Sequence, residues 1–169
     1  MKRKDVVRGS VFCILVAAIM LGGMAVKAEA ASLRLSMADF TTDGEMVAGE
    51  TGFYKHFSGG YISGTASGSD SVCLVAPVKF PTSAKKVKSA VVYAKDNNGS
   101  IDFWAGLYGV DITTGPATFL GDVNSSGSST SIQPLTLDIP DPTLHKNYQY
   151  FLGICLYGSQ YFYGAQITY

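Results

Sequence analysis

Apolar and polar side chains alternate with a period of two along most of the chain after residue 30. Within residues 101–110, Phe103 and Leu107 fall on one side of an extended strand. Trp104 and Tyr108 fall on the other side. Because successive side chains of a strand point to opposite faces, this period predicts β-strands. We expect strands at residues 33–37, 52–62, 72–80, 87–95, 101–110, 117–123, 131–139, 148–156 and 163–169.

The same region does not favour helices. No window of about 12 residues keeps an apolar stripe at helical spacing without an interruption by Gly, Pro or β-branched residues. Eight or nine short strands without an internal repeat or linker predict one domain over residues 31–169, an all-β, antiparallel β-sandwich of jelly-roll type. A chain of about 140 residues is long enough to bury one core. The expected core residues are Leu74, Ala76, Val78, Val91, Tyr93, Phe103, Leu107, Leu135, Leu137, Leu152, Ile154, Leu156 and Ile167.

Residues that tolerate positive φ mark the expected turns. Asp96–Gly99 predicts a tight hairpin between the strands that flank it. Gly158 and Ser159 predict a second hairpin between the last two strands, and Thr114–Pro116 predicts another reversal. Residues 124–131 are polar and form an expected flexible loop.

Two prolines fall inside expected strands. Pro77 and Pro134 each lack a backbone N–H, so neither can donate to a neighbouring strand. We therefore expect both at a sheet edge or a bulge.

The first 30 residues have the three parts of a secretory signal peptide. A basic start is followed by an apolar run over residues 11–26 and by Ala28 and Ala30 in an A-x-A pattern. The run is shorter than the roughly 20 residues that span a bilayer as a helix. Cys13 follows bulky Phe12 inside this run, which fits an ordinary apolar position better than a lipid-modified one. We expect cleavage after Ala30, and a secreted or periplasmic protein without a stable membrane span.

Removal of that segment changes the charge balance. The whole chain has 13 basic and 13 acidic residues, of which 5 basic and 2 acidic ones precede residue 31. The remaining 8 basic and 11 acidic residues give a formal charge near −3. A weakly acidic protein does not neutralise several phosphates, so nucleic acid is not an expected partner.

Two cysteines, Cys73 and Cys155, remain after the expected cleavage. A disulfide persists in an oxidising compartment, and closing a loop of about 80 residues would stabilise the fold by roughly 4 kcal/mol. Two small buried thiols fit the same positions. The sequence leaves both interpretations open.

Two short stretches resemble a loose group of short secreted bacterial β-sandwich proteins of undefined function. These are A-P-V-K-F-P at residues 76–81 and the terminal Y-G-A-Q-I-T-Y at residues 163–169. With the strand spacing between them, the resemblance covers roughly residues 35–169. Phe80 departs from the aliphatic residue that we expect there. The resemblance implies an exported β-sandwich and brings no catalytic residue with it.

Side chains for acid–base or nucleophilic catalysis are sparse. The only two histidines are His56, on a strand that would expose it, and His145, in an expected loop. Glu45 and Glu50 share a Gly-containing segment, which does not favour the paired carboxylates of a glycosidase. No G-x-S-x-G nucleophile motif is present. We expect neither an enzyme nor a cofactor.

One segment has residues that suit either a calcium site or a turn. Asp96, Asn98, Ser100 and Asp102 present side-chain oxygen at alternate positions, as the start of an EF-hand loop does. Leu107 stands where that loop needs a bidentate Glu. A turn explains the same residues, and no metal is expected.

Aromatic residues are the remaining candidates for function. Trp104 and Tyr108 share a strand face opposite the expected core face, and Tyr157, Tyr161 and Tyr163 gather near the last strand. Aromatic rings offer a large apolar area with little rotamer entropy, which suits sugar rings or a protein partner. They are also favoured in strands for packing alone.

Two functions of different classes follow. The first is a secreted, non-enzymatic β-sandwich that acts as a binding or adhesion module for a glycan or a cell-surface protein. The alternative is a small eight-stranded outer-membrane β-barrel, because the chain ends in Tyr169 with Ile167 and Ala165 at alternate positions before it. Pro77 and Pro134 oppose the barrel, since each removes a hydrogen bond from a closed sheet.

Overall fold

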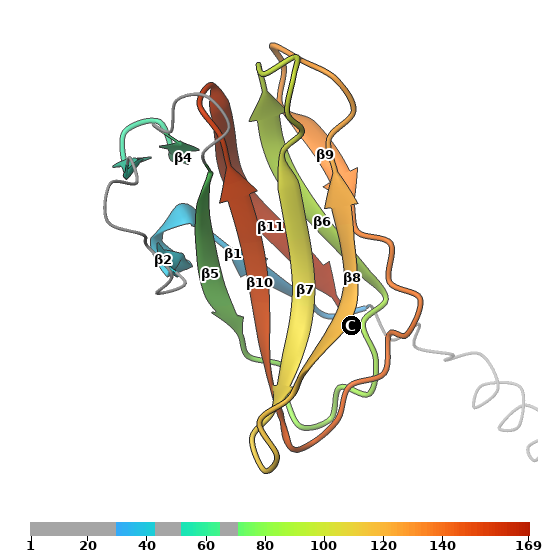
Figure 1. Cartoon of the computed structure of the whole chain (residues 1–169). Coiled ribbons are helices and arrows are strands. Elements are labelled where there is room, and N and C mark those ends of the chain that lie inside the picture. Colours follow the sequence, from blue (N-terminus) through green and yellow to red (C-terminus); the bar gives the residue numbers. More distant parts are fainter. Residues whose placement is uncertain (1–29, 43–51, 65–70) are drawn as a thin grey trace, which may run out of the picture. The chain divides into compact units, whose positions relative to one another are not determined.

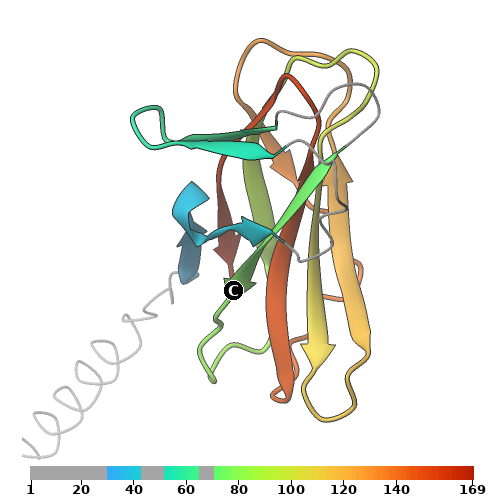
Figure 2. The ribbon, with the colours of Figure 1, turned by 60° about the vertical axis from the view of Figure 1, so that its left-hand side comes forward.

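The computed structural model describes residues 30–42, 52–64 and 71–169. The chain from Ala31 to Tyr169 forms one compact unit, in which the described strands build two antiparallel sheets. Figure 2 shows the two sheets packed as layers. These observations confirm the expected all-β sandwich of jelly-roll type. The expected signal peptide lies outside the described residues apart from Ala30.

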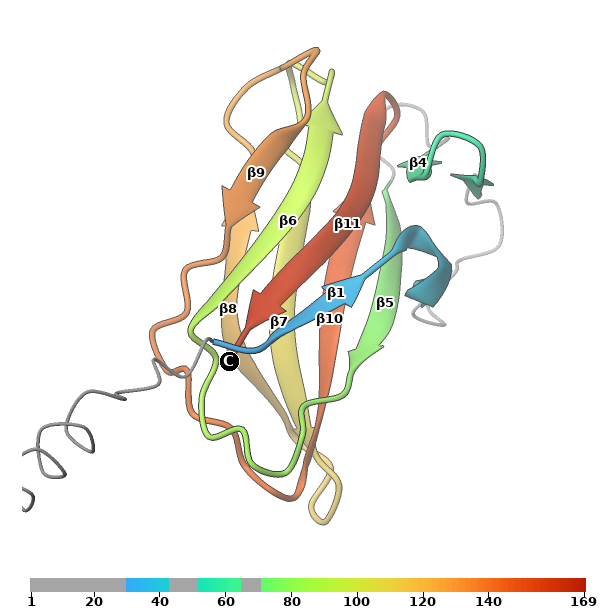
Figure 3. The ribbon, with the colours of Figure 1, turned by 180° about the vertical axis from the view of Figure 1, so that it is seen from behind.

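One layer is a six-stranded sheet in the order β3-β4-β11-β6-β9, with β1 paired to β11 (Figure 3). Strand β11 opposes β4 at Tyr161 and Phe162, and it opposes β1 over residues 165–168. Two short strands therefore succeed each other along one edge of β11. The strands of this sheet are β1 (Ser32–Leu35), β3 (Phe53–His56), β4 (Tyr61–Gly64), β6 (Ser89–Asp96), β9 (Gln133–Thr136) and β11 (Gln160–Thr168).

The other layer is a five-stranded sheet in the order β2-β5-β10-β7-β8, which faces the viewer in Figure 1. A short 3₁₀ turn, η1 (Met37–Asp39), separates β1 from β2, and a capping box between Ser36 and Asp39 closes its start. The described residues contain no α-helix. The strands of this sheet are β2 (Thr41–Thr42), β5 (Val72–Val78), β7 (Trp104–Asp111), β8 (Ala117–Asn124) and β10 (Tyr148–Leu156).

The expected β-barrel alternative needs one closed sheet. The strands instead form two sheets with separate edges, at β3 and β9 in one and at β2 and β8 in the other. The barrel is therefore not supported. No described helix has the length and hydropathy to cross a membrane.

Two of the expected hairpins are wrong. Strands β6 and β7 belong to different sheets, so the segment that begins with Asp96–Gly99 crosses between layers. None of these residues has positive φ, which a tight two-residue hairpin requires. Ser159 does have a φ of 70°, yet β10 and β11 also lie in different sheets. The third turn is confirmed, since Thr114–Pro116 joins the paired strands β7 and β8 and Gly115 has a φ of 87°.

The prolines lie where their missing N–H groups predict. Beside Pro77 in β5, only β10 pairs, because β2 reaches no farther than Leu74 and Val75. Pro134 lies in β9, the outermost strand of its sheet. The expectation of edge positions is confirmed for both.

Residues 52–62, expected as one strand, form the hairpin of β3 and β4. The N–H groups of Gly59 and Gly60 donate to the His56 carbonyl oxygen at 3.1 and 2.8 Å. Gly60 has a φ of 68°, a left-handed conformation that glycine adopts without a Cβ clash. An apparently continuous aromatic strand therefore reverses direction at its glycine pair.

The core lies between the two sheets and is confirmed at most expected positions. The ring of Phe162 lies at its centre, with its centroid 4.7 Å from that of Phe40 and 6.5 Å from that of Phe103. Burying one such side chain contributes about 1.5–3 kcal/mol. The expected residues that are buried are Leu74, Ala76, Val78, Phe103, Leu107, Leu137, Leu152, Ile154, Leu156 and Ile167.

The expectation for β6 is wrong by one residue. Val92 and Ala94 are buried, whereas Val91 is half-buried and Tyr93 is exposed. The five apolar residues 90–94 in succession allow either alternation, so the sequence alone does not decide whether Tyr93 or its neighbours face the core. Leu135, also expected in the core, packs against it only partly buried.

A β-bulge interrupts β11. Phe162 opposes Ala94 of β6 and Gly164 opposes Tyr93, so Tyr163 is an extra residue without a partner on β6. The bulge keeps Phe162 and Ala165 buried on the same inner face although they are three residues apart.

Candidate functional site

The outer face of the five-stranded sheet carries the most extended arrangement of aromatic side chains. Tyr108 of β7 lies opposite Phe119 of β8 and opposite Phe151 of β10, and Phe151 lies opposite Pro77 of β5. This register produces a row across four neighbouring strands. In Figure 1, which looks onto this face, no described segment crosses in front of β10, β7 and β8. We call Trp104, Tyr108, Phe119 and Phe151 the aromatic face.

Trp104 lies four residues before Tyr108 on the same strand, a separation of about 13 Å. Its indole N–H donates to the Asp122 Oδ2 atom of the neighbouring strand at 2.9 Å. This hydrogen bond fixes one end of the ring and satisfies its polar atom. The apolar part of a half-buried indole is then left for contacts at the surface.

Two glycines separate Trp104 from the Tyr108–Phe151 row. Gly106 and Gly153 lie opposite each other on β7 and β10. A Cβ on Gly106 would overlap the far end of the Trp104 ring, and a Cβ on Gly153 would meet that ring at 3.5 Å. The indole therefore lies over Gly106, where an added Cβ would force the ring to shift, whereas a Cβ at Gly153 would make an ordinary van der Waals contact with it.

The Tyr108 and Phe151 rings pack against each other. Their centroids are 5.6 Å apart and their planes differ by 21°. Phe119, on the other side of Tyr108, remains 57% exposed. Such exposure of a large apolar ring beside two more rings is typical of a binding surface.

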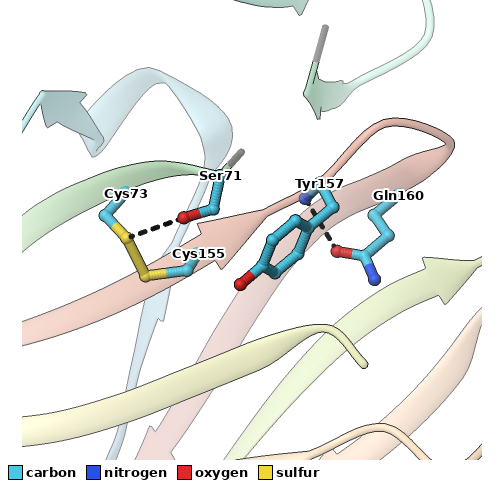
Figure 4. Close-up of a disulfide and its surroundings, with 5 residues drawn as sticks. All are labelled: Ser71, Cys73, Cys155, Tyr157 and Gln160. Carbon is cyan, nitrogen blue, oxygen red and sulfur yellow. Dashed lines mark hydrogen bonds between the residues drawn. A yellow bond between two sulfur atoms is a disulfide. The ribbon is translucent and has the colours of Figure 1, made fainter. Parts of the chain in front are cut away.

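A disulfide borders the aromatic face. Cys73 and Cys155 lie opposite each other on β5 and β10 and are bonded, with their Cα atoms 4.1 Å apart (Figure 4). Cys155 also lies opposite Trp104 on β7. Of the two interpretations left open by the sequence, the structure has the bonded pair. The cross-link ties β5 to β10, the central strand of this sheet.

The five aromatic residues singled out from the sequence do not form one surface. Trp104 and Tyr108 lie on the aromatic face, whereas Tyr161 and Tyr163 belong to the other sheet. Tyr157 is half-buried in the connection between β10 and β11, where its N–H donates to the Gln160 side chain at 2.9 Å (Figure 4). The three tyrosines are close in sequence. Tyr157, however, lies in the connection that crosses from one sheet to the other, whereas Tyr161 and Tyr163 lie in β11.

Tyr161 and Tyr163 form a second group with Tyr61 and His56. Tyr61 lies 5.4 Å from Tyr161 and 5.5 Å from Tyr163 between ring centroids, and it stacks on His56 at 4.4 Å. The Lys95 amino group lies 5.3 Å from the centre of the Tyr161 ring. Burial raises the pKa of Tyr163, and the neighbouring Tyr61 and Tyr161 add to the rise. These rings are largely used to fix the β3–β4 hairpin to β11.

The two histidines lie in different parts of the fold and make different contacts. His56, expected to be exposed, is half-buried and its Nε2 atom lies 2.9 Å from the Ser63 hydroxyl. His145 is exposed in the connection before β10, where its ring lies 5.0 Å from that of Tyr148. Neither lies beside a nucleophile and a carboxylate in a triad arrangement among the described residues.

Of the four side chains that could have been calcium ligands, Asp96 and Asn98 accept hydrogen bonds within the protein. Both Asp96 carboxylate oxygens accept hydrogen bonds, including those of Phe103 N–H and the Ser125 hydroxyl. The Asn98 side-chain oxygen accepts from the N–H groups of Ser100 and Ile101 at 3.0 and 3.2 Å. The Asp96 and Asn98 side chains therefore accept hydrogen bonds that hold this turn in place. Glu45 and Glu50 lie outside the described residues.

Phe119 and Phe151 were missed as candidates. Each stands at a position of its strand that points away from the core, and Phe151 alternates with the core residues Tyr150 and Leu152. The sequence shows the alternation of inward and outward positions, but it does not show that β7, β8 and β10 are neighbours. Strand order therefore decides which outward rings meet.

The comparisons with known proteins show similarity in fold. No family model and no curated protein matches the sequence. A solved "xylan-binding module CBM15" is similar with a TM-score of 0.51 and 13% identity, over 82% of this chain and 96% of that one. A β-(1,4)-mannanase with GH26 and CBM35 parts from Podospora anserina has a TM-score of 0.41 and 14% identity, over 81% of this chain and 27% of that one. The chain has the β-sandwich fold that the first of these structures has.

Proposed function

We propose that this protein is a non-catalytic glycan-binding module that acts outside the cytoplasm through the aromatic face. The observation that carries the proposal is the cross-strand register that brings Trp104, Tyr108, Phe119 and Phe151 together on one face of the five-stranded sheet. A sugar ring presents C–H groups on its flatter side, and the negative faces of aromatic rings attract them.

The details of the surface favour an extended ligand. The row from Phe119 to Pro77 crosses four strands, which are about 4.8 Å apart from one to the next. Trp104 supplies a second contact about 13 Å away along β7. Several rings at these separations contact several sugar residues of one polysaccharide chain. The fold similarity to a module named for xylan binding makes xylan the first probe.

Binding without catalysis agrees with the residues on this face. On the aromatic face the Asp122 carboxylate is engaged, because it accepts the hydrogen bond of the Trp104 indole. A glycosidase needs two carboxyl groups across the scissile bond. The aromatic face is suited to holding a glycan rather than to cleaving it.

The test is a binding isotherm with soluble xylan, measured by calorimetry. We expect Trp104→Ala to weaken binding by about 30-fold, the effect of removing an interface residue worth about 2 kcal/mol. Tyr93→Ala is the matched control, because Tyr93 is exposed on the outer face of the other sheet. Thermal unfolding of each variant establishes that the fold persists.

A further variant separates the two aromatic groups. Tyr161→Ala removes a ring from the group around Tyr61, and we expect it to leave xylan binding within twofold of the wild type. Loss of binding in Tyr161→Ala with full binding in Trp104→Ala would move the site to the other sheet. Absence of binding to xylan and to a panel of other polysaccharides would overturn the proposed function.

A further inference from the structure

A cleft opens at the end of the sandwich where β5 ends and β10 begins. Its volume is about 730 Å³. Residues 77–82, 84 and 85 line one side, and the other side is formed by residues 144–146 and 148–151. In Figure 1, β5 ends and β10 begins toward the lower end of the five-stranded sheet. The cleft is separate from the Trp104 part of the aromatic face.

The walls of the cleft are positively charged. Lys79, Lys85 and Lys146 line it, and no Asp or Glu is among its lining residues. All three lysines are exposed, and among the described residues no hydrogen bond or ion pair engages their amino groups. Unpaired charges of one sign in a concave site attract an ion of the opposite sign. This concentration is notable because residues 31–169 carry a formal charge near −3.

Asp141, four residues before His145 of the cleft wall, has its carboxylate engaged by Thr143. Asp141 accepts a hydrogen bond from the Thr143 N–H at 3.1 Å. Hydrogen bonds from the Thr143 backbone and side chain hold the pKa of Asp141 below its usual value, and the His145 charge lowers it further. Asp141 makes no ion pair with the three lysines among the described residues. The lysines therefore remain available to an external anion.

The floor of the cleft is aromatic and is fixed in place. The Phe80 and Tyr150 ring centroids are 5.3 Å apart, and those of Tyr148 and Tyr150 are 6.1 Å apart. The Tyr150 hydroxyl accepts a hydrogen bond from the His145 N–H at 2.6 Å, which ties the loop before β10 to the strand. Rings beside ammonium groups provide both an apolar contact and a charge.

Phe151 connects the cleft to the aromatic face. It lines the cleft, and its ring also packs on Tyr108 at 5.6 Å. A polysaccharide that lies across the aromatic face is thereby led to the three lysines. On the basis of the proposed function, we infer that the ligand is an acidic glycan and that the cleft binds the anionic group of one of its sugar residues.

Carboxylate and sulfate groups share the chemistry that this cleft recognises. Each is a multi-oxygen anion that accepts several charge-assisted hydrogen bonds from lysine. The probes are polygalacturonate for the carboxylate, dextran sulfate for the sulfate, and neutral xylan. We expect the wild type to bind at least one anionic probe about tenfold more tightly than xylan, since one charge-assisted contact is worth about that factor.

The decisive variant replaces the cleft lysines together, as Lys79→Gln, Lys85→Gln and Lys146→Gln. We expect it to lose the preference for the anionic probe and to keep xylan binding within twofold. The matched control is Arg34→Gln, Lys86→Gln and Lys88→Gln, which removes the same charge from outside the cleft. We expect this control to retain at least half of the preference.

The outcomes separate this inference from the proposed function. If the cleft variant and the control bind the anionic probe equally, the inference is overturned, whatever their affinity for xylan. If Trp104→Ala loses xylan binding but the wild type shows no preference for either anion, the proposed function stands and the inference fails. If the cleft variant alone loses anion binding while Trp104→Ala changes nothing, the cleft binds anions and the proposed role of the aromatic face fails.

Discussion

The carboxylate of Asp96 joins the segments that cross between the two sheets. It is 1% exposed at the end of β6. Its Oδ1 atom accepts from Asn98 N–H at 2.8 Å and from the Gln160 amide at 3.1 Å. Its Oδ2 atom accepts from Phe103 N–H at 3.1 Å and from the Ser125 hydroxyl. We predict that Asp96→Asn destabilises the protein strongly. The new NH₂ group is a hydrogen-bond donor, and it would face groups that are themselves donors.

The size of the effect follows from these bonds. Asparagine keeps the shape of the side chain but retains one accepting oxygen, so the donors of the other oxygen lose their acceptor. A hydrogen bond to a charged group contributes about 1.5–3 kcal/mol. Part of the loss is offset, since Phe103 N–H also donates to the Ser125 hydroxyl at 2.8 Å and the Gln160 amide also donates to the Ile101 carbonyl at 2.7 Å. We expect the free energy of unfolding to fall by about 3 kcal/mol, which for this size lowers Tm by about 10 °C.

Equilibrium unfolding in urea measures this change, with the disulfide intact. The matched control is Asp102→Asn, which removes the same charge six residues away at an exposed position. Surface substitutions of that kind change stability by about 0.5 kcal/mol or less. If Asp96→Asn and Asp102→Asn unfold at the same urea concentration with the same slope, the argued role of the buried carboxylate is wrong.

Three further predictions concern other parts of the fold. Replacing Cys73 and Cys155 together by Ala should lower the free energy of unfolding by about 4 kcal/mol, because the bond closes a loop of 82 residues in the unfolded chain; an unchanged denaturation midpoint would contradict this. Gly121→Ala should cost about 3 kcal/mol in the same assay, because a Cβ there overlaps the Asp138 backbone carbonyl, and a midpoint near that of the wild type would show that β8 can move away. Burial raises the pKa of Tyr150, so the unfolded state ionises first and stability should decline as pH rises from about 10 toward the raised pKa. Tyr150→Phe should flatten that decline in thermal unfolding at several alkaline pH values, and an equally steep decline would refute the assignment.

The strands could be predicted from the sequence because alternation and turn residues are local properties. Pro134 indicated that β9 lies at an edge, and Pro77 indicated a position with a partner strand on one side only. The pairing could not be predicted. Asp96–Gly99 contains the residue types of a hairpin turn, yet Asp96 folds inward to hold the segments that cross between the layers. Residue type decides whether a turn can form, and long-range contacts decide which strand comes next to it.

The candidate site shows the same division. Trp104 and Tyr108 were identifiable because they alternate with core residues on one strand. Their partner Phe151 lies more than 40 residues farther along the chain, and only the register of β7 with β10 brings it beside Tyr108. The lysines of the cleft come from two such separate segments, so their common position was also not available from sequence spacing.

The bulge in β11 makes one position of this strand expendable for the interior. Phe162 and Gly164 already oppose adjacent residues of β6, so deletion of Tyr163 would leave a regular strand with every inward side chain in place. Only one ring on the outside of the six-stranded sheet would disappear. A related chain that is one residue shorter here would have the same interior. If such a chain were aligned with this one without a gap at Tyr163, the residues before it would be assigned to the wrong side of the sheet.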